Sequence, residues 1–391
     1  MSELSYLEKL LDGVEVEWLP LSGLARIRNG KDHKSLSEGE FPVYGSGGIM
    51  RYVDTYAYNK PSVLIPRKGS LGNLFFVNVP FWTVDTIFYT EIDEAQIRPK
   101  YLYYFLTTVG LGEMNQAGGV PSQTQSVLNK LKIPIPCPGN PQKSLAIQSE
   151  IVRILDKFTA VTAELTAELT AELNMRKKQY NYYRDQLLSF DEEQEKPIYL
   201  EKLLDGVEVE WLPLSDLARI RNGKDHKSLS EGEFPVYGSG GIMRYVDTYA
   251  YNKPSVLIPR KGSLGNLFFI DVPFWTVDTI FYTEIDEAQI RPKYLYYFLS
   301  TVGLGEMNQA GGVPSQTQSV LNKLKIPIPC PDNPEKSLAI QSEIVRILDK
   351  FDTLTNSITE GLPREIELRQ KQYEYYRDLL FSFPKPETIS N

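Results

Sequence analysis

The stretch YLEKLLDGVEVEW, which runs from Tyr6 to Trp18, recurs without change from Tyr199 to Trp211. The offset of 193 residues holds without insertion as far as the pair Phe190 and Phe383. A repeat of this length exceeds the few tens of residues of a solenoid unit, and each copy is large enough to fold alone. The sequence therefore predicts a duplicated domain with a connector after each copy.

The two copies differ little over their first part. The 153 positions from Tyr6 to Phe158 contain six differences. The six pairs are Gly23/Asp216, Val77/Ile270, Asn78/Asp271, Thr107/Ser300, Gly139/Asp332 and Gln142/Glu335. Residues 159–175 and 352–368 then diverge almost fully, and similarity returns over 176–190 and 369–383 with four differences in 15 positions. The duplication thus keeps a globular unit nearly intact, whereas the middle of the connector varies.

The first part of each copy is expected to be a mixed α/β domain. Residues 41–44, 62–66, 73–77 and 86–90 are rich in β-branched and aromatic side chains and predict short strands. Glycine-containing turns at 45–48 and 67–72 separate some of them. Pro99 is placed to open a helix, and Ile133-Pro-Ile-Pro-Cys-Pro138 predicts an extended segment that closes the domain. The expected fold class is therefore α+β.

The second part of each copy has the pattern of a long amphipathic helix. No proline or glycine occurs from Lys143 to Phe190, and apolar residues recur three or four positions apart, as on one helix face. These residues are Ile151, Leu155, Phe158, Val161, Leu165, Leu169 and Leu173. In the second copy, Lys336–Phe383, the sequence Gly361-Leu-Pro363 predicts a kink or a break.

We expect these two helices to pack against each other as an antiparallel coiled coil that separates the globular units, which gives the chain a pseudo-two-fold arrangement. The predicted divisions are a first domain at 1–142, a helix and linker at 143–198, a second domain at 199–335, and a helix and tail at 336–391.

The motif Thr-Ala-Glu-Leu occurs three times in succession from Thr162 to Leu173. Each four-residue block lengthens a helix by about 6 Å and rotates it by about 40° relative to a whole turn. Such a segment has two interpretations, a ruler that sets a spacing or an ordinary alanine-rich coiled segment. The sequence favours neither.

The charge of the chain is unevenly distributed around a net value of −8. The window Pro20–Ile135 contains 12 Lys+Arg and 9 Asp+Glu, a net of +3, and the matching window Pro213–Ile328 nets +1 because it adds Asp216 and Asp271. The remaining residues therefore carry −12. A basic footprint is usual for nucleic-acid-binding proteins, so the globular parts are the better candidates for such a role and the rest suits contact with protein.

The composition argues against several other classes of protein. Two cysteines form no disulfide framework or ligand cluster, and two histidines exclude a histidine-rich metal site. The first residues have neither a basic start nor a long apolar stretch, and no run approaches the length that spans a bilayer. We therefore expect a cytoplasmic protein without a metal site.

The layout of domain, helix, domain and helix resembles the specificity subunit of type I restriction–modification enzymes, above all the type IC group. The resemblance covers essentially the whole chain. The residues that carry it are Leu11-Asp-Gly-Val-Glu-Val-Glu-Trp-Leu-Pro-Leu21, the Thr-Ala-Glu-Leu repeat, the helix starts Ile-Gln-Ser-Glu-Ile-Val-Arg-Ile-Leu-Asp-Lys-Phe at Ile147 and Ile340, and the tail 369–383. Residues 42–49 and 118–125 also resemble segments common in the family.

This resemblance implies a DNA-binding protein with no catalytic activity of its own. Each globular part would be a target-recognition domain that reads one half of a split site in double-stranded DNA. The helices would dock two modification (methyltransferase) subunits, through which restriction subunits join. S-adenosylmethionine would bind to the modification subunits, and this chain would bind no cofactor.

The chain departs from the family pattern in one respect. Family members normally carry two different recognition domains and read asymmetric sites, whereas the two halves here are near copies. Two copies of one reader on antiparallel helices predict an interrupted palindrome, because the symmetry of a site mirrors that of the protein that binds it. The length of its spacer should follow the length of the helices.

Four segments of each copy have the residue types that bind DNA, namely cations for phosphates and amides or guanidinium groups for base edges. They are a basic loop at 28–34, a glycine turn at 45–48 with Arg51, a cationic turn at 67–73 and an amide-rich segment at 115–125. The candidates in the first copy are Arg28, Lys31, His33, Lys34, Ser46, Gly47, Arg51, Arg67, Lys68, Ser70, Asn73, Gln116, Ser122, Gln123 and Gln125. Those in the second copy are Arg221, Lys224, His226, Lys227, Ser239, Gly240, Arg244, Arg260, Lys261, Ser263, Asn266, Gln309, Ser315, Gln316 and Gln318.

Each segment also has an ordinary structural interpretation. The basic loop and the cationic turn could be solvated surface, and glycine turns are common in all proteins. His33 could be a surface or core residue, and Ser122 or Thr124 could cap a helix at 125–131. These alternatives remain open at the level of the sequence.

Two other functions compete with DNA recognition by a specificity subunit. Asn78-Val-Pro-Phe81 partly resembles the Asn-Pro-Pro-Phe loop of adenine methyltransferases, but the second copy has Asp271 and no glycine-rich cofactor strand accompanies either. A DNA-free scaffold or antirestriction protein is the second alternative, against which the duplicated basic and amide-rich loops argue. No nucleophile–base pair or carboxylate pair stands out, so we expect no catalytic residues.

Overall fold

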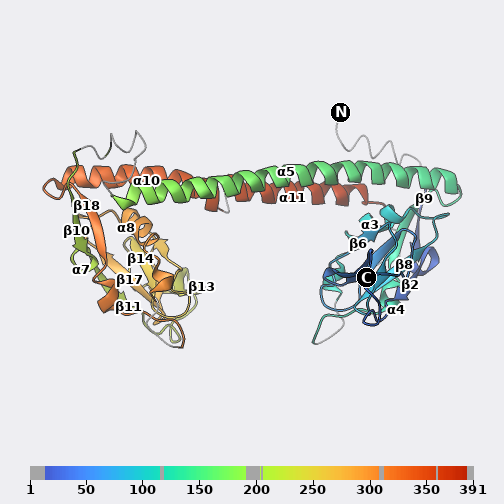
Figure 1. Cartoon of the computed structure of the whole chain (residues 1–391), viewed down its shortest axis with the longest axis horizontal. Helices are drawn as coiled ribbons and strands as arrows, with labels where there is room; N and C mark the ends of the chain where they lie inside the picture. Colours follow the sequence, from blue (N-terminus) through green and yellow to red (C-terminus); the bar gives the residue numbers. More distant parts are fainter. Residues whose placement is uncertain are drawn as a thin grey trace. The chain divides into compact units, whose positions relative to one another are not determined.

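The structure is a computed structural model that describes residues 14–114, 119–190, 203, 206–307, 312–357 and 360–384. It divides into two compact units (Figure 1). Unit 1 combines Met1–Glu168 with Ile366–Asn391, and unit 2 is Leu169–Glu365. Each unit therefore takes its globular domain from one repeat and part of its helical portion from the other. The expected α+β class, with two mixed α/β domains and long helices, is confirmed.

The described residues of the domain of unit 1 form three small sheets, ordered β1-β9, β2-β8-β5-β6 and β4-β3-β7. All neighbouring strands are antiparallel except β3 and β7. The strands are β1 (Val16–Pro20), β2 (Ala25–Asn29), β3 (Phe41–Gly45), β4 (Gly48–Val53), β5 (Ser62–Pro66), β6 (Phe75–Val77), β7 (Trp82–Thr83), β8 (Ile87–Ile92) and β9 (Lys132–Pro136). The short helices are α2 (Leu21–Leu24), α3 (Pro99–Leu106), the 3₁₀ helix η1 (Leu111–Glu113) and α4 (Gln125–Leu128).

Helix α3 organises the core of this domain. It packs against β5 and β6, and Pro99 occupies its first turn as expected. Tyr101 is fully buried, and its hydroxyl donates to the carbonyl of Pro134 on β9 at 2.7 Å, which satisfies a polar group that would otherwise be costly to bury. The extended run ends at Pro136, because Cys137 takes a left-handed backbone with φ of 48° and so is not extended as expected.

Unit 2 repeats this architecture with its own strands and helices. Its strands are β10 (Val209–Pro213), β11 (Ala218–Asn222), β12 (Phe234–Gly238), β13 (Gly241–Val246), β14 (Ser255–Pro259), β15 (Phe268–Ile270), β16 (Trp275–Thr276), β17 (Ile280–Ile285) and β18 (Lys325–Pro329). Its short helices are α7 (Leu214–Leu217), α8 (Pro292–Leu299), η2 (Leu304–Glu306) and α9 (Gln318–Leu321). The sheet orders match those of unit 1 strand for strand.

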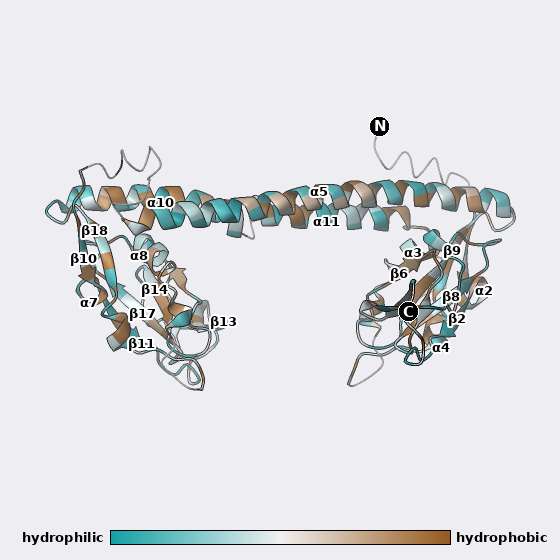
Figure 2. Ribbon diagram, viewed as in Figure 1, coloured by the Kyte–Doolittle hydropathy of each residue, from teal (hydrophilic) through white to brown (hydrophobic). Residues whose placement is uncertain are grey.

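The long helices follow the predicted pattern, including the break. Helix α5 is continuous from Pro141 to Ser189, and Figure 2 shows hydrophobic residues recurring along it between hydrophilic ones. The corresponding stretch of the second repeat forms α10 (Pro334–Asn356) and α11 (Gly361–Leu380). Gly361 opens α11 with φ of +77°, a conformation that glycine adopts at little cost, and Pro363 lies in the first turn of that helix.

Antiparallel helix packing is present inside each unit. In unit 1, Phe158 of α5 stacks on Tyr376 of α11 with ring centroids 5.4 Å apart and planes at 11°. The hydroxyl of Thr159, one residue further along α5, donates to that of Tyr373, three residues earlier on α11, at 3.1 Å. In unit 2, Tyr183 of α5 stacks on Phe351 of α10 at 5.4 Å. The amphipathic stripes therefore meet each other, as the sequence predicts.

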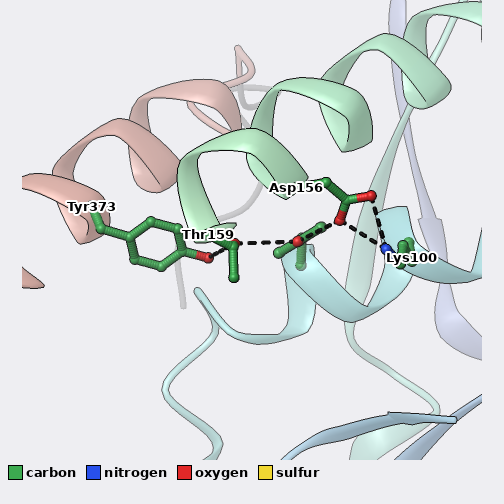
Figure 3. Close-up of polar contacts among 5 residues, drawn as sticks. Lys100, Asp156, Thr159 and Tyr373 are labelled. Atoms are coloured by element: carbon green, nitrogen blue, oxygen red, sulfur yellow. Dashed lines mark hydrogen bonds and ion pairs between the residues drawn. The ribbon is translucent and has the colours of Figure 1, made fainter. Parts of the chain in front are cut away.

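A polar chain joins α3 to the helix pair of unit 1 (Figure 3). Lys100 donates to both carboxylate oxygens of Asp156 on α5 at 2.9 and 2.8 Å, and the Tyr104 hydroxyl donates to one of them at 2.7 Å. Tyr104 also lies 3.3 Å from the hydroxyl of Thr159. Burial raises the pKa of Tyr104, so the phenol stays protonated and acts as a donor. These contacts fix the domain against α5.

The end of each long helix closes the core of the domain that belongs to the other repeat. In unit 1 the core cluster includes Leu380, Phe381 and Phe383, and the Trp18 indole donates to the carbonyl of Pro384 at 2.9 Å. In unit 2 the equivalent residues Leu187, Leu188 and Phe190 join the core cluster. Neither repeat completes a domain by itself.

We therefore expect Phe381→Ala to destabilise unit 1 alone. Phe381 is 6% exposed and contacts the rings of Tyr101 and Phe105 at 5.3 and 5.6 Å, so truncation leaves a cavity that costs about 3–5 kcal/mol. Hydrogen exchange with mass spectrometry checks this, because peptides that span 74–81 and 267–274 differ in mass through Val77/Ile270 and so report on the two units separately.

The peptide of unit 1 should exchange faster in Phe381→Ala, and that of unit 2 in the matching variant Leu188→Ala. Tyr375→Ala is the control, since Tyr375 is 62% exposed and surface substitutions usually change stability by less than about 0.5 kcal/mol. Equal acceleration in both units would show that the helix ends are not specific to one domain.

Candidate nucleic-acid interface

The main sheet of unit 1 brings two of the candidate segments to one end. In β2-β8-β5, Asn29 pairs with Phe88 and Pro66 pairs with Ile87. The last residues of β2 and β5 and the first residue of β8 therefore share one end of the sheet. The basic loop after β2, the cationic turn after β5 and residues 83–86 before β8 all leave from this end, which we call the loop edge.

The glycine turn between β3 and β4 joins the loop edge through Ser46. The Ser46 backbone amide donates to the Thr86 hydroxyl at 3.3 Å, and the Asn73 side-chain amide donates to the Ser46 carbonyl at 3.3 Å. Thr86 in turn accepts from the backbone amides of Arg67 and Lys68 through its carbonyl, at 2.8 and 3.2 Å. Two segments that are distant in sequence are thus held side by side.

The amide-rich segment also lies on the loop edge, as far as it is described. The Gly69 backbone amide donates to the Pro121 carbonyl at 2.8 Å, and the Gln123 backbone amide donates to the Arg67 carbonyl at 3.0 Å. The Gln125 side chain, at the start of α4, donates to the Asn29 side-chain oxygen at 3.3 Å. Figure 1 shows α4 on the part of unit 1 away from α5, so this surface is not covered by the helix of its own unit.

A close backbone approach anchors the basic loop. Gly30 lies so near β7 that a Cβ atom there would meet the carbonyl oxygen of Val84 at 2.0 Å. The Lys31 amide donates to Thr83 at 2.7 Å, and the Trp82 indole donates to the Lys31 carbonyl at 3.1 Å. These contacts fix the backbone from which the exposed Lys31 and Lys34 side chains project.

The cations of the loop edge differ in how far they are neutralised. Arg28 pairs with Glu91 at 3.0 Å, and the 47% exposed Lys68 side chain lies 3.8 Å from Asp85. Lys31 and Lys34 form no salt bridge within the described residues. The acid nearest to them in sequence, Asp32, stays ionised, because the Lys34 backbone amide donates to it and lowers its pKa.

Two arginines are tied to the backbone. Arg51 donates to the Leu36 carbonyl at 3.1 Å, which links β4 to the segment that follows the basic loop. Arg67 donates to the Asp85 carbonyl at 3.4 Å and lies over the Phe88 ring at 5.9 Å. Both guanidinium groups therefore hold the loop edge together, and each keeps donors that these bonds do not use.

The remaining candidates have varied environments. Gln123 is only 2% exposed and donates its side-chain amide to the Pro66 carbonyl at 2.5 Å, which makes it a support for the turn. His33 is half-buried, and its Nδ1 has no partner within the part of the chain that the structure describes. Gly47 and Ser70 are exposed, and Ser122 is half-buried beside Lys68. Gln116 and Gln309 lie outside the described residues.

The loop edge of unit 2 reproduces most of these contacts. The Ser239 backbone amide donates to the Thr279 hydroxyl, and the Asn266 side-chain amide donates to the Ser239 carbonyl, both at 3.3 Å. The Gln318 side-chain amide donates to the Asn222 side-chain oxygen at 3.3 Å. The other candidates of the second copy lie 193 residues after their equivalents in the first copy. They are Arg221, Lys224, His226, Lys227, Gly240, Arg244, Arg260, Lys261, Ser263, Ser315 and Gln316. Two copies of one surface are therefore present.

None of the six differences between the copies falls on the loop edge. Gly23/Asp216 precedes β2 and β11, whose first residues pair with Ile92 and Ile285 at the other end of the sheet. Asn78/Asp271 follows β6 and β15, whose last residues pair with Ser62 and Ser255 at that same far end. The chemistry of the two loop edges is thus identical residue for residue.

Three residues that build this surface were not among the predicted contacts, although one of them, Asn29, lies inside the predicted basic loop. Thr86 was expected in a strand, yet it bonds to both the glycine turn and the cationic turn. Asp85 and Asn29 orient Lys68 and Gln125. Short polar residues of this kind occur in any loop, so no pattern in the sequence could single them out.

Two further classes of site were tested. Within the described ranges, no group of three His, Cys, Asp or Glu side chains is placed to hold a metal ion. Among the helices of those same ranges, none combines the length and the hydropathy that crossing a membrane requires.

Comparison with known proteins finds the same kind of relative along the whole chain. A family model described as the type I restriction modification DNA specificity domain matches residues 14–175 and again 206–368. The EcoR124I/EcoR124II specificity subunit of Escherichia coli, a type I restriction enzyme component, is 42% identical over 433 residues, covering 100% of both chains. The EcoprrI specificity subunit of Escherichia coli is 37% identical and covers 92% of this chain and 93% of its own.

Solved structures agree on the fold. The S subunit of a type I restriction–modification system from M. genitalium superposes with a TM-score of 0.52 at 19% identity, covering 96% of this chain and 98% of its own. A chain from a structure on complex assembly and conformational transition of the type I R-M system gives a TM-score of 0.57 at 14% identity, covering 94% and 97%. At these identities the likeness concerns the fold alone.

The close approach at Gly30 gives a test of the loop edge. We expect Gly30→Ala to displace the basic loop, because the new Cβ would overlap backbone atoms of β7, and overpacking of this kind costs about 1–3 kcal/mol. The readout is faster hydrogen exchange at the Lys31 backbone amide. The peptide that contains it can be told apart from its equivalent in the second copy, because the substitution changes its mass.

The control is Gly47→Ala, since a Cβ at Gly47 meets nothing within 4 Å. It should leave the exchange of the Lys31 amide unchanged. Unaltered exchange in Gly30→Ala would mean that the basic loop is not anchored as described.

Proposed function

We propose that this chain, which belongs to the family of type I restriction–modification DNA specificity subunits, selects one interrupted palindromic DNA site by presenting the same loop edge twice. The proposal rests on the identity of the two loop edges, because none of the six differences between the copies lies on them. Two identical readers that are related by two-fold symmetry require the same half-site on opposite strands. The chain itself would act by binding and not by catalysis.

The chemistry of the loop edge supports binding to double-stranded DNA. Exposed Lys31 and Lys34 are suited to phosphates, for which a compact cation on a long stem is sufficient. Gln125 carries an amide that can donate and accept together, as adenine recognition requires. Its present bond to Asn29 is 3.3 Å long and exposed, so DNA could replace it.

The long helices are proposed to dock two modification subunits, one at each unit. Tyr375 on α11 is 62% exposed and Tyr182 on α5 is 53% exposed, at equivalent positions of the two repeats. Each ring is held at 5.4 Å by an edge contact to the next tyrosine, Tyr376 or Tyr183, which packs inside the helix pair. Exposed rigid tyrosines are typical of protein interfaces.

The charge outside the globular parts also suits protein partners, since it sums to −12. In this proposal the modification subunits bind S-adenosylmethionine and methylate adenine, restriction subunits join through them, and the chain holds no cofactor.

Mapping of DNA methylation tests the function directly. We would co-express the chain with a type IC modification subunit and map N6-methyladenine over the host genome by single-molecule sequencing. The expected result is methylation at one interrupted palindrome, because both loop edges are the same.

An asymmetric split site would contradict the proposal that both loop edges bind the same half-site. The pairs Gly23/Asp216 and Asn78/Asp271, at the far end of the sheet, would then be the candidates for the difference. A stable complex without methylation would overturn the DNA-reading function in favour of a DNA-free scaffold. The control is the modification subunit expressed alone.

Salt dependence of binding provides a second, independent test. In the double variant Lys34→Ala/Lys227→Ala, each copy loses a cation proposed to contact phosphate. The slope of log affinity against log salt concentration should then become shallower by about two, roughly one for each lysine.

The matched control is Lys60→Ala/Lys253→Ala. Lys253 lines an open pocket with Asp286 and Ile285, at the end of the sheet opposite to the loop edge, and Lys60 is its equivalent. This control should keep the slope of the parent chain. Equal slopes for all three proteins would remove the basic loop from the DNA contact.

A further inference from the structure

A β-bulge lies at the tip of the β3–β4 hairpin. Val43 pairs with Arg51 and Tyr44 pairs with Ile49, so Met50 has no partner in the ladder. The turn closes through Gly45 and Gly48, and Gly48 has φ of +118°, which a residue with a side chain rarely adopts. The second copy has the same bulge at Met243, between Ile242 and Arg244.

The bulge places two neighbouring apolar side chains in solvent. In a regular strand, consecutive side chains face opposite sides, so one of the two would be turned toward the domain. Here Ile49 is 49% exposed and Met50 is 59% exposed, and the second copy gives 50% and 58% for Ile242 and Met243. Bulges commonly redirect side chains in this way next to functional sites.

The position of Met50 depends on a glycine. A Cβ atom at Gly45 would lie 2.8 Å from the Met50 sulfur, so the methionine side chain rests against the bare backbone of the turn. The same Cβ would lie 3.4 Å from the Thr86 hydroxyl, the group that accepts the Ser46 amide. Met50 therefore lies beside Gly45, next to Thr86 of the loop edge.

The surroundings of the pair identify the kind of partner. Thr86 also accepts the backbone amides of Arg67 and Lys68, so the cationic turn adjoins the hairpin tip. Figure 1 places β13, the equivalent strand of unit 2, away from α10, so the helix of the same unit does not cover it. A partner that fits here combines negative charge with a small apolar group. DNA has both, since the thymine 5-methyl is the apolar feature of the major groove.

We propose that Ile49 and Met50, with Ile242 and Met243 in the second copy, determine specificity by contacting a thymine methyl group in each half-site. The proposal rests on the proposed function, because it requires DNA at the loop edge. The lysines would then contribute affinity that is independent of sequence, whereas this pair would contribute to the choice of base.

The test uses the complex of the full chain with its modification subunits and a duplex that carries the site found by methylation mapping. Each thymine of the half-sites, in either strand, is replaced in turn by deoxyuridine, which keeps the base pair and removes only the methyl group. At one thymine per half-site, the affinity should fall about fourfold for each methyl lost.

The variant Ile49→Ala/Met50→Ala/Ile242→Ala/Met243→Ala should bind the thymine and deoxyuridine duplexes equally. Val79→Ala/Val272→Ala is the matched control, because these valines are 48% and 49% exposed but follow β6 and β15 at the far end of the sheet. It should keep the fourfold sensitivity.

The deoxyuridine scan uses the parent complex, so it tests the contact with a thymine methyl group even where a protein variant folds poorly. No position with reduced affinity would overturn the proposal, as would an undiminished effect in the quadruple alanine variant. Failure of the parent complex to bind the mapped site at all would instead reject the proposed function.

Discussion

Burial of the helix ends is the interaction on which the rest of the structure depends. Each mixed α/β domain leaves an apolar surface around α3 or α8 that its own repeat does not cover. Phe381 packs between Tyr101 and Phe105 in unit 1, and Leu188 takes the equivalent place in unit 2. Because several large side chains are removed from water at each end, this contact holds the helix pair of each unit against the domain of that unit.

The fold was largely predictable because its signals are local. A period of three to four apolar residues predicts the helices, and Gly361-Leu-Pro363 predicts the break that separates α10 from α11. Strands β3, β5, β6 and β8 were anticipated within a few residues, whereas β1, β2, β4 and β7 were not. Charged residues interrupt the apolar pattern of β2 and β4, namely the exposed Arg26 and Arg28 in β2 and the half-buried Arg51 in β4. The bulge at Met50 also removes the alternation by which a strand is recognised.

Contacts between distant segments set the limit of sequence-based prediction. The apolar residues at the end of each helix indicate burial, but nothing local tells which domain buries them. The same holds for the candidate interface. Gln123 has the side chain of a base reader but lies buried against Pro66, and Thr86, an unremarkable threonine by sequence, connects two of the loops. Whether the exposed candidates contact DNA stays a prediction.

The exchange of helix ends also imposes an order in time on folding during synthesis. Leu187, Leu188 and Phe190 are made before the domain they close, so unit 2 can complete its core as soon as its own strands and α10 have emerged. The domain of unit 1 is made first but lacks Leu380, Phe381 and Phe383 until the end of α11 has left the ribosome. At about 5–20 residues per second, the N-terminal domain waits for roughly 10–50 s with an open core. Of these two domains, the one synthesised first is therefore the one finished second.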